Sequence, residues 1–468
     1  MSGVGAPTPE RYRCPSCGRS IRVCQQCHSH NRVLSAHCRG CGAKLIVEPQ
    51  WPQHGYDSAG SHCPPLPGSP PVLIRAWTQT FSRPQEPQGD NATPSPIVVG
   101  DIIVIARHHE GCQAFEARHV ETGDALWLCK LRQSNLGLVG SPVHSGPYAY
   151  FITANPNYIH RIALDSGKRE VCAVRTGDEV LYELPGHLLP NCPPLLIDGS
   201  MCIITSTSAM LVSLDFATSG DGPVLPCVVA EHSRNCQWTR PVQIGDILIS
   251  SDRRGGGFLL IDLSRRPRAL RARVLPLAGC NRIADVTPCV AVQSAHWSGG
   301  AVCCRANADE GPRPASYLLA LLPQEEAQHV HEIPWSESAM MIWKGVASAP
   351  LTDRTFVYVP CLGTEDKQPR IAVVSRDRFT TYPTPCPVNP ALSIFLCRDI
   401  IVLGDSGSPV NIWPFSNRSE RAAPYATHDE VLMPVVTRPL IIGDRLFMQG
   451  GDWLSCYHLQ VKKNEAAV

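Results

Sequence analysis

The sequence predicts a mainly β fold, an eight-bladed β-propeller with seven blades as the alternative, preceded by a small cysteine-rich module. Two observations predict the propeller. From residue 97 onward, short runs of apolar β-forming residues alternate with Gly/Asp turns. This pattern returns at a pitch of roughly forty residues, which is the length of a propeller blade. Three Cys-x-x-Cys pairs within residues 14–41 predict the N-terminal module.

The founding repeat is Ile97–Leu131, where apolar runs are separated by short polar turns. This spacing is typical of an antiparallel meander and not of a helix. One meander cannot bury both of its faces, so further copies are expected to pack against it. Within this repeat we expect strands at Val98-Val99, Ile102–Ala106, Gln113–Ala117 and Leu126–Leu128, with connections at Gly100-Asp101, His108–Gly111 and Thr122-Gly123.

Seven further units follow the founding repeat. Most of them keep a turn followed by two apolar runs, but the last unit is one strand short. A propeller closes when a strand from one terminus completes the sheet begun by the other. The apolar run at Val72–Trp77 is therefore expected to belong to a closing strand over 72–82. The units span 140–174, 193–229, 241–277, 286–335, 346–385, 393–427 and 439–461.

Composition sets the domain organisation. The 468 residues suffice for one large domain and a small appendage: a ribbon at 1–48, a Pro/Gly/Ser-rich linker at 49–71 and the propeller at 72–468. The net charge of +1 gives no global field that would direct the chain to nucleic acid or a membrane. The N-terminus lacks the apolar stretch of a signal peptide, and no apolar run of membrane-spanning length occurs. We expect a cytoplasmic protein.

Cysteine use agrees with a reducing compartment. There are 22 cysteines, and those after the N-terminal six are scattered, many of them within apolar strands. Cysteines in such positions behave as small buried apolar side chains. Examples are Cys129, Cys172, Cys202 and Cys397.

One repeat carries a more specific pattern. Ala117, Thr122, Gly123 and Trp127 have the spacing A-x-D-x-x-T-G-x-x-x-W, with His119 in place of the Asp. This resembles the tryptophan-docking motif of quinoprotein-type propellers, the pyrroloquinoline-quinone-like repeat family. The second unit keeps Ala163, Asp165 and Ser166-Gly167, with two residues missing between, but has Val171 where the Trp would be. The family includes dehydrogenases and cofactor-free scaffolds, so the resemblance implies the fold and leaves the activity open.

The N-terminal module is predicted to be a zinc ribbon. Two Cys-x-x-Cys knuckles supply the four thiolates of a closed tetrahedral Zn²⁺ site, and metal binding would provide most of the folding free energy of so small a segment. Cys24, Cys27, Cys38 and Cys41 form the preferred set, because they resemble the short bacterial zinc ribbon that ends in C-G-A-K-L. The predicted ligands of one or two structural ions are Cys14, Cys17, Cys24, Cys27, Cys38 and Cys41.

The partition of these ligands stays open. Cys14 and Cys17 would need partners at a second site, for which His28, His30, His37 and Cys63 are candidates. A rival arrangement joins the first two knuckles and leaves out the third. A further alternative is that Cys24–His28 is a c-type haem attachment motif. The flanking knuckles, the lack of a secretion signal and the absence of Met between Met1 and Met201 oppose haem.

Several motifs inside the propeller resemble catalytic sites. Gly404–Pro409 matches the nucleophile motif of trypsin-like proteases at five of six positions, but a hairpin turn explains its composition. Cys303-Cys304 resembles the adjacent cysteines beside the quinone of some quinoprotein dehydrogenases, and two buried strand cysteines are the preferred interpretation. His108–Glu110 is interpreted as an exposed turn, and the segment 323–335, with His329 and His331, as a loop.

The expected function is a non-enzymatic scaffold for protein interactions, with no catalytic residue and no quinone. The ribbon and the propeller faces would dock partners in a bacterial-type assembly, and analogy suggests AAA+ ATPases or von Willebrand-A proteins. One alternative is a pyrroloquinoline-quinone-dependent dehydrogenase. The other is nucleic-acid binding through the ribbon, which is basic through Arg11, Arg13, Arg19, Arg22, Arg32, Arg39 and Lys44. No membrane partner is expected.

Overall fold

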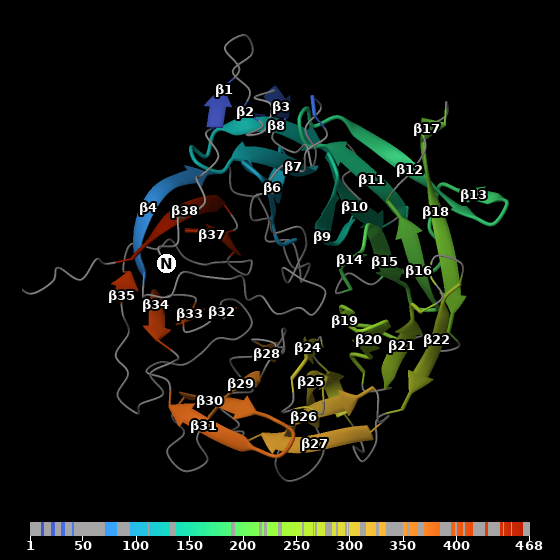
Figure 1. The fold of residues 1–468 in the computed structure, drawn as a ribbon, viewed down its shortest axis with the longest axis vertical. Helices are drawn as coiled ribbons and strands as arrows, with labels where there is room; N and C mark the ends of the chain where they lie inside the picture. Colours follow the sequence, from blue (N-terminus) through green and yellow to red (C-terminus); the bar gives the residue numbers. More distant parts are fainter. Residues whose placement is uncertain are drawn as a thin grey trace, which may run out of the picture.

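The structure is a computed structural model, and the secondary structure of its described part consists of β-strands without an α-helix. The mainly β propeller predicted from the sequence is confirmed at this level. Its sheets follow one another around a ring, and their last strands lie toward the periphery (Figure 1). The described residues are 11–13, 20–23, 30–32, 40–41, 71–81, 94–110, 112–131, 137–154, 156–188, 192–214, 218–219, 222–232, 236–254, 257–264, 266, 269–276, 283–286, 289–294, 297, 299–308, 315–323, 327–333, 350–352, 356–362, 369–383, 395–397, 400–405, 408–414, 426–428, 440–442, 444–450 and 452–461.

The founding repeat forms one four-stranded antiparallel sheet, here called the first sheet. Its strands are longer than the apolar runs predict, because pairing continues through the polar residues at each end. The pair His109↔Cys112 is the last before the turn, so both predicted turn histidines belong to a strand. The first sheet contains β5 (Ile97–Val99), β6 (Ile102–His109), β7 (Cys112–His119) and β8 (Ala125–Lys130).

The next two units are joined into one larger sheet. The end of β12 pairs in parallel with the start of β18, through Ala173↔Val224, Val174↔Leu225 and Arg175↔Pro226. This joined sheet contains β9 (Gly137–Ser145), β10 (Tyr148–Ala154), β11 (Tyr158–Ala163), β12 (Arg169–Thr176), β13 (Glu179–Leu181), β14 (Leu195–Ile197), β15 (Ser200–Ile204), β16 (Ser208–Ser213), β17 (Thr218–Ser219) and β18 (Gly222–Glu231).

Four more antiparallel sheets continue the ring. Among them β27 is a correction, because the segment interpreted from the sequence as a loop pairs with β26 from Leu322↔Ala327 to Ser316↔Ile333. The strands are β19 (Val242–Ile244), β20 (Ile247–Ser251), β21 (Phe258–Asp262) and β22 (Arg271–Leu275); β23 (Ile283–Val286), β24 (Val290–Val292), β25 (Ala301–Ala308), β26 (Ala315–Leu322) and β27 (Ala327–Ile333); β28 (Leu351–Thr352), β29 (Val357–Leu362), β30 (Pro369–Val374) and β31 (Phe379–Pro383); and β32 (Phe395–Cys397), β33 (Ile400–Asp405), β34 (Ser408–Pro414) and β35 (Ala426–His428).

The two ends of the propeller chain meet in the closing sheet. Its strands are β36 (Leu440–Ile442), β37 (Arg445–Gln449), β38 (Trp453–Val461) and β4 (Pro71–Thr80), and β4 pairs antiparallel with β38 along its whole length. An N-terminal strand therefore lies on the outside of the C-terminal sheet. This arrangement covers an edge that would otherwise expose unpaired backbone groups.

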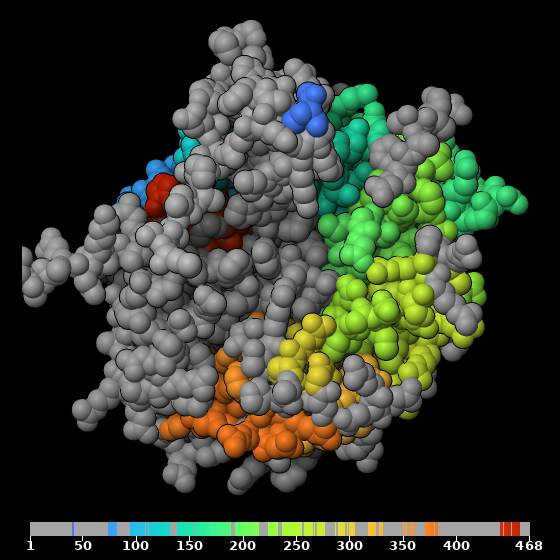
Figure 2. All heavy atoms as spheres, viewed as in Figure 1, coloured from blue at the N-terminus to red at the C-terminus, as the bar shows by residue number. Residues whose placement is uncertain are grey.

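Consecutive sheets are held together by apolar cores between their faces. In β6, Ile103 and Ile105 pack toward the closing sheet, while Val104 and Ala106 pack toward the joined sheet. Because successive side chains of a strand point to opposite faces, a strand buried on both sides must be apolar at nearly every position. This explains why the runs that predicted the repeat are continuous rather than alternating. Figure 2 shows the green, yellow and orange sheets packed side by side along the rim.

Tryptophan docking links the closing, first and joined sheets. Trp127 of β8 donates from Nε1 to the carbonyl oxygen of Leu164 at 2.8 Å and lies against Gly167. Trp77 of β4 repeats this arrangement, with Nε1 donating to the carbonyl oxygen of Val120 at 3.0 Å and its ring against Gly123. The motif recognised in the first sheet therefore accepts one Trp and supplies the next.

Polar contacts reinforce the seam between the closing and first sheets. Arg445 Nη2 lies 2.9 Å from Glu121 Oε1, and Gln449 Nε2 donates to the carbonyl oxygen of Ala106 at 3.1 Å. The guanidinium groups of Arg107 and Arg118 lie 4.9 and 5.2 Å from the centre of the Phe81 ring. Both arginines also form ion pairs with the buried Glu116.

A separate small sheet precedes the ring. It is an antiparallel meander of β1 (Arg11–Arg13), β2 (Ser20–Val23) and β3 (His30–Arg32). Within the described residues there is no helix of the length and apolarity needed to cross a membrane.

Candidate functional site

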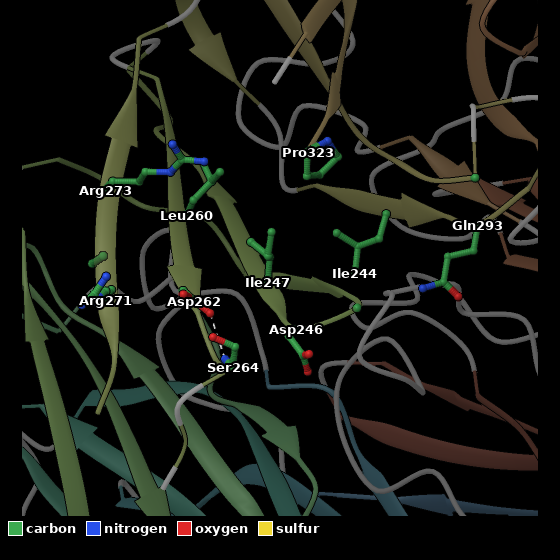
Figure 3. Close-up of a pocket in the computed structure, with 13 residues that line it drawn as sticks. Ile244, Asp246, Ile247, Leu260, Asp262, Ser264, Arg271, Arg273, Gln293 and Pro323 are labelled. Carbon is green, nitrogen blue, oxygen red and sulfur yellow. Dashed lines mark hydrogen bonds between the residues drawn. The ribbon is translucent and has the colours of Figure 1, made fainter. Parts of the chain in front are cut away.

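The described part of the ring contains a cleft of about 760 Å³ between the sheet β19–β22 and the sheet β23–β27. One wall comes from the β19–β20 turn, from β21 and from β22. The opposite wall comes from the β24–β25 and β26–β27 connections. Figure 3 shows the two walls facing each other across the open space. The residues that line it are Ile244, Gly245, Asp246, Ile247, Leu260, Asp262, Ser264, Arg271, Ala272, Arg273, Gln293, Gly299 and Pro323.

Strand register places the first wall in a row. Ile244 pairs with Ile247, Ile247 with Asp262, and Asp262 with Arg271, so these four side chains share one face across all four strands. The row is aliphatic at the inner strands, acidic at β21 and basic at the peripheral strand. Arg273 belongs to the next row, opposite Leu260.

Local turn chemistry fixes the acidic part of the cleft. Asp262 Oδ1 accepts a hydrogen bond from the backbone nitrogen of Ser264 at 2.8 Å, drawn in Figure 3. The nitrogen of Leu263 donates to the carbonyl oxygen of Asp246 at 2.8 Å and ties the two turns together. Asp246 and Arg271 are exposed, so the cleft offers charges of both signs to solvent.

The two walls come close together at Gly300. A Cβ atom on this residue would lie 2.5 Å from Cδ1 of Ile244, so a larger side chain here would require the Ile244 side chain to move. Leu319, Leu321 and Cys304 belong to the same apolar core as Leu260, which lines the cleft. Sequence reasoning missed this site, because the facing of two sheets through long-range packing leaves no local motif.

Five of the six predicted metal ligands, Cys14, Cys17, Cys24, Cys27 and Cys38, lie outside the described residues. Cys41 is exposed and follows Gly40 in a turn. Of the predicted histidine alternatives, His30 begins β3. Within the described residues no group of three or more His, Cys, Asp or Glu side chains is arranged to hold a metal ion.

The segments that resemble catalytic motifs lie on strands of the propeller or between them. Cys303 and Cys304 are buried neighbours on β25 whose side chains enter different cores, beside Val357 and Leu260 respectively. The protease-like segment Gly404–Pro409 spans the end of β33 and the start of β34, which pair through Asp405↔Ser408. Residues 406–407 lie outside the described part of the chain. Scattered Cys129, Cys172 and Cys202 are buried, as predicted.

The histidine cluster of the first sheet is an ion-pair site rather than a three-residue turn. Glu110 alone adopts the left-handed conformation, with φ of 49°. Its carboxylate pairs with Lys130 of β8, and His109 Nε2 lies 3.5 Å from it. The hydrogen bond and positive charge of Lys130, with a smaller contribution from His109, lower the pKa of Glu110.

His119, which replaces the Asp of the docking motif, caps the turn in its place. Its Nδ1 accepts a hydrogen bond from the backbone nitrogen of Glu121 at 3.2 Å, and Thr122 Oγ1 donates to Asp124 Oδ2 at 2.6 Å. These contacts hold the turn that presents Gly123 to Trp77.

Comparison with known proteins supports the fold. No protein-family model matches the chain, and no curated protein matches it. Among solved structures it is similar to a europium-containing methanol dehydrogenase, with a TM-score of 0.53, 9% identity and coverage of 86% of this chain and 89% of that one. Sqt1 of Saccharomyces cerevisiae also matches, with a TM-score of 0.49, 8% identity and coverage of 82% and 100%. At such identity the likeness to the methanol dehydrogenase shows the fold alone, which is a β-propeller.

Proposed function

We propose that this protein is a non-enzymatic interaction scaffold whose propeller and N-terminal ribbon dock partner proteins. The observation that carries the proposal is the distribution of exposed large apolar side chains. Those of the described residues all lie on peripheral strands or directly beside one. They are Ile74 on β4, Leu126 and Leu128 on β8, Val171 on β12, Val180 on β13 with Tyr182 next to it, Val229 on β18 and Val330 on β27.

Peripheral strands offer two means of binding. The outer edge of β8 pairs with no strand among the described residues, and in this proposal it accepts a strand from a partner. Leu126 and Leu128, 47% and 37% exposed, flank the docking Trp127 on the same strand. This edge and these two side chains would together offer a partner both backbone groups and apolar contact area.

The experiment is affinity purification of the full chain from cells that naturally contain it, compared with variants. A chain lacking residues 1–48 tests the ribbon, and Leu126→Lys with Leu128→Lys tests the rim. Ala125→Lys, which adds charge on β8 without removing a large apolar side chain, is the matched control. Loss of a specific partner from either test variant supports docking. A full chain that retains no partner at all overturns the proposal.

The zinc site is part of the same proposal. The preferred Zn²⁺ site consists of Cys24, Cys27, Cys38 and Cys41. Two Cys-x-x-Cys knuckles supply the four thiolates of a closed tetrahedral site, and this pair resembles the short bacterial zinc ribbon.

We further propose that the ring has eight blades. The joined sheet consists of two four-stranded meanders, β9–β12 and β14–β16 with β18, connected by the short parallel pairing of β12 with β18. Counting these two separately with the other six sheets gives eight. An experimental structure with seven repeated sheets would contradict this count. Partner classes such as AAA+ ATPases or von Willebrand-A proteins rest on analogy alone.

A further inference from the structure

The cleft between β19–β22 and β23–β27 has the dimensions and chemistry of a binding site. Its volume of about 760 Å³ falls within the roughly 300–1,000 Å³ of ligand pockets. The row Ile244, Ile247, Asp262, Arg271 crosses four strands. At about 4.8 Å between neighbouring strands, its ends are about 14 Å apart.

This length matches an extended peptide. Side chains at positions i and i+4 of an extended chain point the same way and lie about 13–14 Å apart. An aliphatic side chain over Ile244 and Ile247 would therefore place a side chain four residues away at Arg271. The intervening residue on the same side would meet the carboxylates of Asp246 and Asp262.

The charges of the cleft select the occupant. Arg271 is exposed at the peripheral end and favours a carboxylate, which its guanidinium group can bind through two parallel hydrogen bonds. Asp246 is exposed at the turn and favours a cation. The aliphatic end requires an apolar side chain, because burying a polar one there would cost its hydration.

We propose that the cleft binds an extended segment of a partner protein with an aliphatic side chain at one position, a basic one two residues away and an acidic one four residues away. This inference rests on the proposed scaffold function and names the partner chemistry for one of its surfaces. The complementary order of apolar, negative and positive groups in the cleft supports it.

The test uses the full chain and two fluorescein-labelled peptides, Leu-Ala-Lys-Ala-Glu and the reverse order Glu-Ala-Lys-Ala-Leu, both with blocked ends. Fluorescence anisotropy measures binding. We expect at least one peptide to bind and Arg271→Gln to weaken its binding by about two- to fivefold, the range for an exposed charged pair. Arg175→Gln, which changes an exposed arginine on β12, is the matched control and should leave affinity unchanged.

A peptide with Gln in place of Glu completes a double-mutant cycle. On the unaltered protein, the Gln peptide should bind more weakly than the Glu peptide. On Arg271→Gln the two peptides should bind equally, because the pair between arginine and glutamate is already lost there. Failure of both parent peptides to bind, or equal affinity of the unaltered and Arg271→Gln proteins, overturns the proposal. The scaffold function fails separately, when the full chain retains no partner, so the two failures are distinguishable.

Discussion

At the scale of single residues, the packing of tryptophan on glycine gives the clearest energetic consequences. Gly123 has φ of +71°, and a Cβ there would lie 2.8 Å from the Trp77 ring. Two costs therefore combine on substitution. A side chain in the left-handed region costs about 1–2 kcal/mol, and overpacking a well-filled contact costs about 1–3 kcal/mol.

We expect Gly123→Ala to lower the free energy of unfolding by about 2–5 kcal/mol. Gly146 provides the matched control, because its φ is +56° and nothing lies within 4 Å of the position of a Cβ. Gly146→Ala should cost only the backbone part. Urea unfolding followed by tryptophan fluorescence measures both variants. Equal losses would show that the contact with Trp77 contributes nothing.

Buried histidine makes stability depend on pH. His160 is 3% exposed, stacks on Phe151 and contacts Thr153 Oγ1 through Nε2 at 3.1 Å. Burial, reinforced by the charge of Arg169, lowers its pKa from 6.5 to about 4. Between those values the unfolded chain binds a proton that the folded chain does not, so stability falls as the pH falls from 6.5 toward 4.

We expect His160→Gln to reduce the dependence of the urea midpoint on pH between pH 7 and 5. Burial also lowers the pKa of His144 to about 4, so part of the dependence should remain in this variant and decrease further in His144→Gln/His160→Gln. The urea midpoints of the unaltered chain and the two variants are measured at pH 7, 6 and 5. An identical pH dependence in all three proteins would show that these buried histidines do not cause it.

At the scale of elements, closure depends on β4. This strand pairs with β38 along its length and supplies Trp77 to the first sheet. We expect a chain beginning at residue 71 to stay folded and monomeric. A chain beginning at residue 94 should expose the edge of β38 and aggregate, because long unpaired edges recruit other chains. Size-exclusion chromatography and hydrogen exchange in 453–461 compare the two. Matching behaviour would mean that β4 is dispensable.

Apolar runs predicted most strands but not their ends. The central residues of β6 and β7 are identified by their side chains, whereas pairing of His108, His109 and Cys112 extends the hairpin through backbone hydrogen bonds that any residue can make. The strand β27 was missed for a related reason. Its Gln, His and Glu residues suit a peripheral strand with one solvated face, and they weaken the apolar pattern.

Local motifs and long-range packing differ in what a sequence reveals. Trp127 and Gly123 were found because they lie within one motif, although each docks to a different neighbouring sheet. The docking of Trp77 could not be predicted, because its partner Val120 comes near it only when the closing sheet packs against the first sheet. The same limit applies to the cleft, where Gly300 faces Ile244 only after two sheets pack together.

At the scale of the whole molecule, the ribbon and the propeller should respond differently to metal removal. The ring is held by apolar cores between its sheets, from Leu454 and Ile103 at the closing seam to Val302 and Leu260 at the cleft. Residues 1–48 contain few apolar residues and depend on thiolate–zinc bonds in our proposal. Each part therefore has its own source of folding free energy.

We expect a zinc chelator to make residues 1–48 sensitive to trypsin while the ring remains resistant. Mass spectrometry of the fragments locates the cuts, which should fall at arginines such as Arg22 and Arg32. Cys38→Ser should reproduce the sensitivity without chelator and lower the bound zinc by one ion per chain, whereas Cys456→Ser, at a buried cysteine of β38, should leave the zinc content unchanged. Zinc content that is equal in the Cys38→Ser and unaltered chains would place the metal on other ligands, and the preferred knuckle pairing would then be wrong.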